Sequence, residues 1–298
     1  MSFAFNPKRN VETEFRRIAV EQIQRAIAEI DNTGLSDDDT VHQVRKRCKK
    51  LRALYRLARG ALGEQYAAGN AHFRDLARDL SGTRDAAVML ETFNHLLEKR
   101  GLSPAEERFQ ALNDLLIRRS LVKAGPEESA EKLANARQKL VDAVTSVHEI
   151  QLSASGFDAL KFGVKKTYAR MRKAMKAAHS SPSDEILHEW RKRVKYHWYQ
   201  LRLLRKTWRG LLDATARKAG VLADLLGDDH NLAVLAETIR KTPEDVVAIP
   251  EKDIALNLIA ERRDRLQRKA YRLGEHLVTD KPEAFAKRIG EHWRISAH

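Results

Sequence analysis

Two arginine-rich segments of this sequence follow nearly the same order of residues. The first begins at His42 and reads HQVRKRCKKLRALYRLAR, and the second begins at His188 and reads HEWRKRVKYHWYQLRLLR. They start 146 positions apart (188 minus 42), almost half of the 298-residue chain, and RDAAVMLETF and HNLAVLAETI repeat at the same offset. A repeat at a fixed offset indicates an internal duplication. We therefore expect two homologous halves, residues 1–152 and 153–298.

The spacing of apolar residues predicts helices along the whole chain. Apolar residues recur at steps of three and four, Gly and Pro number only 14 and 7, and no alternating strand pattern stands out. We expect an all-α fold in which the two halves form helical bundles related by a pseudo-twofold axis. The run GDDH at 227–230 is typical of one helix ending and another beginning, so a break is expected there.

A line of mostly cationic residues runs along each arginine-rich segment. Residues three and four apart share one face of a helix, which places six residues of each segment on one line. The first line is His42, Arg45, Lys49, Arg52, Arg56 and Arg59, and the second is His188, Arg191, Lys195, Trp198, Arg202 and Arg205. An apolar line lies one position earlier in each segment, so the basic line borders the buried face.

Such a line suits a linear polyanion. Neighbouring like charges destabilise a helix, yet no carboxylate interrupts the first line over about 17 residues, roughly 26 Å of helix. The alternative is a solvated face whose cations pair with carboxylates of neighbouring helices, including the acidic runs at 36–39 and 227–230. The spacing of the cations persists in both segments while the residues between them differ, which favours an anion-binding face.

The overall charge agrees with a polyanionic ligand without identifying it. Lys and Arg total 55 against 41 Asp and Glu, a formal charge of +14, which attracts nucleic acid, anionic membranes or condensed phosphate alike. Cys48 is the single cysteine, so no intramolecular disulfide and no cysteine-based zinc site can form. No apolar run reaches the roughly 18 residues of a membrane span, and no signal peptide stands out. We expect a soluble, cytoplasmic protein and leave its oligomeric state open.

The two segments resemble a known family. VHQVRKRCKKLRALYRL and LHEWRKRVKYHWYQLRL, each followed by a segment such as RDAAVMLE or GDDHNLAVL, are similar to the two halves of a CHAD domain, the conserved-histidine α-helical domain. The resemblance covers about residues 10–293. It implies helical bundles with a basic groove or pore between them, binding of inorganic polyphosphate, and association with polyphosphate granules. It supplies no cofactor and no catalytic residue.

The resemblance also implies which residues bind. The family's histidine falls on His42 and His188, and KKTYARMRKAMK at 165–176 resembles the family's tyrosine-and-arginine helix. The second half departs from the pattern, with Tyr196 and Trp198 where cations are expected. The residues expected to bind polyphosphate are His42, Arg45, Lys46, Lys49, Lys50, Arg52, Arg56, Arg59, Tyr168, Arg170, Arg172, Lys173, His188, Arg191, Lys192, Lys195, Tyr199, Arg202 and Arg205, with Arg16 and Arg25 as weaker candidates.

The two histidines allow two interpretations. Like charge nearby favours the neutral form of a histidine, and a bound polyanion reverses that preference. This predicts tighter binding at pH 6 than at pH 8, an effect removed when both residues are changed to Gln. The alternative is a buried histidine that is hydrogen-bonded near the start of its helix.

The sequence bears on three other functions. A divalent metal site in a helical bundle would use the D-x-x-H and E-x-x-H pairs Asp39, His42, Glu185 and His188. Nucleic-acid binding is expected to be non-specific, because aromatic residues make up only 6% of the chain and no recognition motif is present. Catalysis is not expected, since neither a phosphate-binding loop nor a nucleophile elbow occurs and Cys48 lies on the apolar line.

Overall fold

The protein is helical, as the apolar spacing predicts. The computed structural model describes residues 3–80, 84–121 and 126–298, and within these ranges it contains eleven α-helices, one 3₁₀ turn and no strand. The helices up to residue 148 are α1 (Val11–Ile30), α2 (Asp37–Leu57), α3 (Gln65–Asp79), α4 (Arg84–Glu98), η1 (Glu107–Phe109), α5 (Gln110–Leu121) and α6 (Pro126–His148). The later helices are α7 (Asp158–Ser180), α8 (Asp184–Leu204), α9 (Arg209–Lys241), α10 (Ile249–Leu277) and α11 (Pro282–Ala297).

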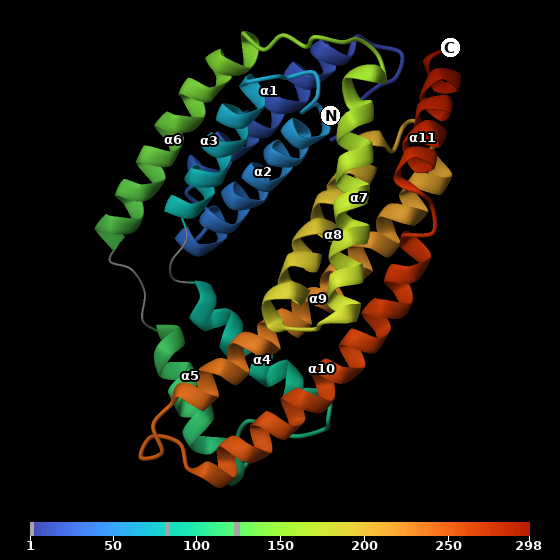
Figure 1. The fold of residues 1–298 in the computed structure, drawn as a ribbon. Coiled ribbons are helices and arrows are strands. Elements are labelled where there is room, and N and C mark those ends of the chain that lie inside the picture. The colour runs from blue at the N-terminus through green and yellow to red at the C-terminus, as the bar shows by residue number, and fades with distance from the viewer. Residues whose placement is uncertain (1–2, 81–83, 122–125) are drawn as a thin grey trace.

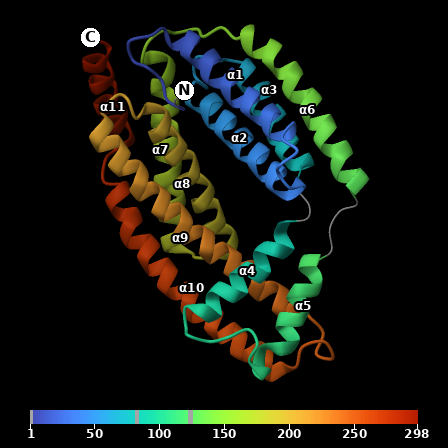
Figure 2. The ribbon, with the colours of Figure 1, turned by 180° about the vertical axis from the view of Figure 1, so that it is seen from behind.

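The helices lie in two groups side by side. Helices α1, α2, α3 and α6 pack together, and α7 to α11 form the second group (Figure 1). Helices α4 and α5 leave the first group and lie beside the lower parts of α9 and α10, as the view from behind also shows (Figure 2). The chain therefore crosses between the groups before its midpoint.

The buried core has two parts, and each contains residues from both sides of position 152. The larger part contains Phe15 and Leu51 together with Trp190 and Leu222. The smaller part packs Phe93, Phe109 and Leu116 of the α4–α5 region against α9 and α10. Apolar burial of this kind stabilises helices that would be marginal alone.

A close backbone contact sets the position of α2 against α7. A Cβ atom at Gly163 would lie 1.8 Å from the Leu57 carbonyl oxygen. Only glycine allows the two helices to approach this closely. The contact places the C-terminal end of α2 beside the second group of helices.

The expected break at 227–230 is wrong, because α9 continues through it. Asp229 is buried, and its carboxylate accepts hydrogen bonds from Arg263 Nε at 3.0 Å and Gln267 Nε2 at 2.8 Å. Gly227 faces the Arg191 side chain, whose Nε would lie 3.2 Å from an added Cβ. Side-chain packing across helices therefore overrides a local pattern that is typical of helix ends.

Helices long and apolar enough to cross a bilayer are absent from the described part of the chain.

Candidate polyanion-binding site

The two basic helices begin in the same way. In α2 the Ser36 side chain accepts a hydrogen bond from Asp39 N, and in α8 the Ser183 side chain accepts one from Ile186 N. The Ser36 hydroxyl also donates a hydrogen bond to the Asp39 carboxylate at 2.7 Å. The Ser183 hydroxyl donates one to the Glu185 carboxylate at 2.8 Å. Carboxylates in a first turn stabilise the helix dipole. Asp39 and Glu185 are therefore occupied with helix capping.

The alternative metal site gains no support from this arrangement. Among the described residues, no group of three or more His, Cys, Asp or Glu side chains comes close enough to hold a metal ion.

Helices α2 and α8 bring their basic lines together around Lys49. Desolvation is the largest effect that lowers the pKa of Lys49 to about 8, followed by the charges of Arg45, Arg191, Lys195 and Arg52. Two of these cations come from α2 and two from α8. We call these five residues the central cluster: Arg45, Lys49, Arg52, Arg191 and Lys195.

Uncharged partners hold the cations at the end of the first line. The Arg56 guanidinium carbon lies 4.0 Å from the Tyr196 ring centroid, and Arg56 Nη1 donates to the Arg52 carbonyl oxygen at 3.2 Å. Arg59 donates to the Arg56 carbonyl oxygen at 2.7 Å and to Thr167 Oγ1 at 2.8 Å. These partners fix the side chains and leave their charges uncompensated.

Burial makes these charges costly. Lys50, Arg56 and Arg59 are only 7%, 7% and 8% exposed, and none forms an ion pair with a carboxylate of the described residues. Desolvation, followed by Arg47 and Arg202, lowers the pKa of Lys50 to about 8. Desolvation also lowers the pKa of Arg56. An unpaired buried cation costs free energy, which a bound anion would recover.

The second line is partly neutralised. Lys195 Nζ lies 3.5 Å from Asp224 Oδ1 of α9. Desolvation lowers the pKa of Arg191, and the negative charges of Asp224 and Asp228 partly oppose this effect. The acidic run at 227–230 therefore contributes Asp228 to the site, as the alternative interpretation anticipated. Arg202 packs on the Trp198 ring, 4.8 Å from its centroid.

Two residues expected in the site belong to the core, and their assignment is corrected. Tyr168 is 1% exposed, stacks on Phe285 with ring centroids 4.3 Å apart, and accepts a hydrogen bond from Asp280 N. Tyr199 is 6% exposed and packs edge-on against Phe3. Neither ring has surface to offer a ligand.

Several of the remaining candidates form ion pairs with carboxylates. Lys192 pairs with Glu189 at 2.5 Å and Arg205 with Asp213 at 3.1 Å, so carboxylates partly neutralise both cations. Arg16 and Arg25 pair with Glu12 and Glu21, and both belong to α1. Exposed candidates without a resolved ion pair are Lys46, Arg170 and Lys173, whereas Arg172 is half-buried.

His188 packs against another histidine. Its ring centroid lies 4.1 Å from that of His230, and desolvation, followed by the charge of His230, lowers the pKa of His188 to about 4. The lowered pKa favours a neutral His188 in the unliganded protein, which both interpretations expect, and the buried Nδ1 of His188 has no hydrogen-bond partner among the described residues. His42 is half-buried on α2.

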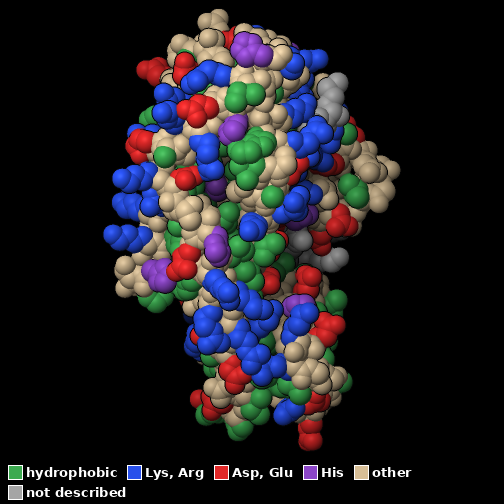
Figure 3. Space-filling view, turned by 90° about the vertical axis from the view of Figure 1, so that its right-hand side faces the viewer, with side chains coloured by type: hydrophobic (Ala, Val, Ile, Leu, Met, Phe, Trp, Pro, Cys, Tyr) green, Lys and Arg blue, Asp and Glu red, His purple; other side chains and the backbone are tan. Residues whose placement is uncertain are grey.

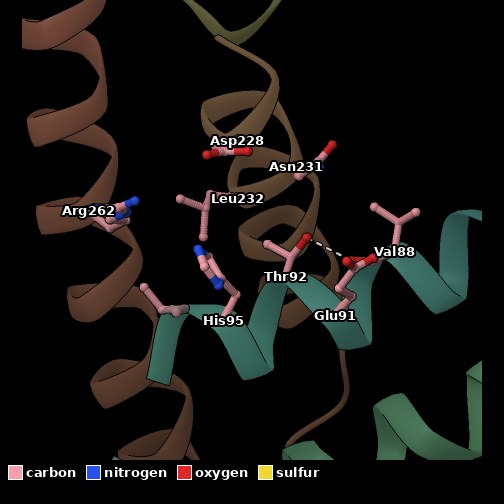
Figure 4. A pocket seen from close by; sticks show the side chains of 9 residues that line it. Val88, Glu91, Thr92, His95, Asp228, Asn231, Leu232 and Arg262 are labelled. Carbon is pink, nitrogen blue, oxygen red and sulfur yellow. Dashed lines mark hydrogen bonds between the residues drawn. The ribbon is translucent and has the colours of Figure 1, made fainter. Parts of the chain in front are cut away.

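A cleft of about 270 Å³ opens between α4, α9 and α10. His95, Arg262 and Asp228 line it (Figure 4). Desolvation raises the pKa of Asp228, and the nearby Arg262, His95 and Arg191 partly oppose this. The mixed charges of this cleft do not match a polyanion, in contrast to the central cluster.

The outer face of α10 and α11 shows what an ordinary charged surface looks like here. Figure 3 shows Lys and Arg on this face interspersed with Asp and Glu. Arg268 pairs with Asp264 at 2.8 Å, and Arg288 pairs with Asp280. Pairs of this kind are weak and neutralise charge.

Sequence reasoning missed the uncharged partners of the cations. Phe3 and Tyr66 lie outside the two arginine-rich segments, yet their rings face Lys50 and Arg59. Thr167 lies within the segment 165–176 but is not among the residues expected to bind. The one available signal was Tyr196, which occupies the repeat position of Lys50.

The fold and the site define an all-α protein whose two basic helices face each other. A model of the CHAD domain matches residues 17–240 of the chain, so the chain belongs to the CHAD domain family. Two curated proteins of Mycobacterium tuberculosis are similar to it: "Uncharacterized protein MT2285" of strain CDC 1551 / Oshkosh and "Uncharacterized protein Rv2226" of strain ATCC 25618 / H37Rv. Each is 30% identical over 210 residues, which cover 67% of this chain and 39% of the relative. The match thus spans about two-fifths of the length of these relatives.

Proposed function

We propose that this protein binds inorganic polyphosphate without catalysis, along the facing basic lines of α2 and α8. Arginine presents a planar fork that binds phosphate oxygens in pairs, and lysine adds a mobile point charge. Membership in the CHAD family supports a polyphosphate-related role. We also propose that the protein is located in the cytoplasm and associates with polyphosphate granules.

One observation carries the proposal. Lys50, Arg56 and Arg59 are buried, and their described partners are a ring, carbonyl oxygens or a hydroxyl rather than carboxylates. A solubilising surface would instead mix signs, as α10 and α11 do. The uncompensated charge of these three buried residues adds to the positive potential at the neighbouring central cluster, where an anion from outside would bind.

The contacts between α2 and α8 support an internal duplication and a groove between the two halves, which we also propose. Arg56 contacts Tyr196, and at the same offset of 146 positions Arg202 lies within electrostatic range of Lys50. Lys49 likewise lies within range of Lys195, its own repeat equivalent. Contacts related in this way are what a pseudo-twofold axis between the helices would produce.

A calorimetric titration at about 0.15 M salt tests the function. The ligands are long-chain polyphosphate, tripolyphosphate and single-stranded DNA. The test variant changes Arg45, Lys49, Arg191 and Lys195 to Ala, and the matched control removes four exposed cations of α10: Arg265, Arg268, Lys269 and Arg272.

We expect tight, chain-length-dependent polyphosphate binding that exceeds DNA binding. It should disappear in the test variant and persist in the control. Equal and weak binding of all three ligands, or equal losses in both variants, would show a generic basic surface instead.

A further inference from the structure

Two pairs of opposite charges lie side by side between α9 and α10, and only one pair is joined. Asp229 Oδ1 lies 3.0 Å from Arg263 Nε, so these two residues form an ion pair. Asp228 and Arg262 each stand one position earlier in the sequence, yet neither forms an ion pair with a described residue. Desolvation raises the pKa of Asp228, and Arg262 is the charge that opposes this effect most. The two groups therefore lie near each other but are separated by a gap.

The cleft between α4, α9 and α10 occupies this gap. Its volume of about 270 Å³ is just below the roughly 300–1,000 Å³ of pockets for drug-sized ligands, so it suits a smaller molecule. Figure 4 shows Arg262 of α10 and Glu91 of α4 at opposite sides of the cleft, with Asp228 of α9 between them in this view. Glu91 likewise forms no ion pair with a described residue. One fixed cation thus shares the cleft with two carboxylates.

Apolar side chains complete the lining of the cleft. Val88 and Leu96 come from α4, and Leu232 comes from α9. Leu96 and Leu232 are buried core residues that also border the cleft. The Thr92 hydroxyl donates a hydrogen bond to the Val88 carbonyl oxygen at 2.7 Å, so its proton is already used within α4. A ligand that matches the whole lining carries both charges and an apolar group.

We propose that this cleft binds a small zwitterion, an α-amino acid with an apolar side chain. Arg262 would hold the ligand carboxylate with its planar fork, and His95 would add a hydrogen-bond donor beside it. Asp228 and Glu91 would accept hydrogen bonds from the ligand ammonium group. The apolar side chain would lie against Leu96 and Leu232.

Ligands with a single charge match the cleft less well. An anion at Arg262 would be repelled by the carboxylates of Asp228 and Glu91, and a cation at these carboxylates would be repelled by Arg262. A zwitterion brings each of its charges to a group of opposite sign. Each charge that leaves water on binding is then paired, which offsets the cost of its desolvation.

Isothermal titration of the full chain tests this site at pH 7 and about 0.15 M salt, without polyphosphate. The amino acids are glycine, L-valine, L-leucine and L-methionine. Two further compounds each lack one charge of leucine, since 4-methylpentanoate has no ammonium group and 3-methylbutylamine has no carboxylate. We expect saturable binding of L-leucine, L-valine or L-methionine at one molecule per chain. Glycine and both single-charge compounds should bind at least about tenfold more weakly, because each lacks a group that the cleft would pair or bury.

Three variants locate the binding. Arg262→Gln and Glu91→Gln each remove one charge of the cleft, and we expect each to weaken binding at least about tenfold. Arg265→Gln is the matched control, because Arg265 is exposed and lies one turn further along α10. Its affinity should equal that of the unchanged protein. Glu91 is also exposed, so Glu91→Gln retains the fold and keeps the test decisive if Arg262→Gln is unstable.

The outcomes separate this inference from the proposed function. No saturable binding of any of the four amino acids would overturn it. So would binding of 4-methylpentanoate or 3-methylbutylamine as tight as that of L-leucine, or equal losses in Arg262→Gln and Arg265→Gln. Neither Arg262 nor Glu91 belongs to the central cluster, and polyphosphate is absent from the titration. Each proposal can therefore fail while the other stands.

Discussion

The guanidinium of Arg56 on α2 rests on the ring of Tyr196 on α8, with 4.0 Å between the guanidinium carbon and the ring centroid. The contact joins the two basic helices and holds a buried cation without neutralising it. It therefore links the stability of the fold to the charge of the site.

Replacing Tyr196 tests this contact. We expect Tyr196→Leu to lower the free energy of unfolding by about 1 kcal/mol, as desolvated cation–π pairs contribute about 0.5–2 kcal/mol. Tyr196→Phe keeps the ring and should be nearly neutral. Urea unfolding of both variants provides the measurement, and equal losses in the two would assign the effect to the hydroxyl instead.

Asp224 should weaken polyanion binding, because it pairs with Lys195. We expect Asp224→Asn to bind long-chain polyphosphate about two- to fivefold more tightly at 0.15 M salt and with a steeper salt dependence, since one more cation becomes available. Asp264→Asn on α10 is the matched control, because it frees Arg268 on the outer face. Calorimetry at several salt concentrations measures both. Tighter binding in the control alone would contradict the placement of the site.

Gly163 should not tolerate a side chain. A methyl group there would lie 1.8 Å from the Leu57 carbonyl oxygen, so we expect Gly163→Ala to destabilise the protein by at least about 3 kcal/mol. Gly210 on α9 has open space around it, and Gly210→Ala should be neutral or stabilising by up to about 1 kcal/mol. Thermal unfolding compares the two variants. Similar melting temperatures would show that α2 and α7 are further apart than described.

The stability should fall in mild acid. His197 is buried between Tyr168 and Phe285, and desolvation lowers its pKa to about 4. Between pH 6.5 and 4 the unfolded chain binds a proton at this residue that the folded chain does not bind, so stability rises with pH in this window and is constant above it.

The loss on acidification should reach roughly 2–3 kcal/mol from this residue, at about 1.4 kcal/mol per pKa unit. His197→Phe should reduce the slope of the free energy of unfolding against pH, measured by urea unfolding at pH 7.5, 5.5 and 4.5. Part of the slope should remain, because the pKa of His188 is lowered to about 4 as well. An unchanged slope in the variant would place the titrating groups elsewhere.

The spacing of residues along single helices could be read from the sequence. Residues 42–57 and 188–204 lie in helices whose basic lines border an apolar line, because the 3.6-residue period of a helix determines which residues share a face. Arg59 and Arg205 lie just beyond the C-terminal ends of these helices. The serine caps of α2 and α8 also depend only on residues a few positions apart. The all-helical class and the candidate cations of the central cluster therefore followed from local rules.

The tertiary structure decided which of these cations carry uncompensated charge. The ring over Arg56 comes from α8, the hydroxyl that binds Arg59 comes from α7, and the carboxylate beside Lys195 comes from α9. The same packing buried Tyr168 and carried α9 through the run at 227–230. Each of these results depends on atoms distant in sequence being brought within a few ångströms, where desolvation and Coulomb forces act, and no local pattern encodes those distances.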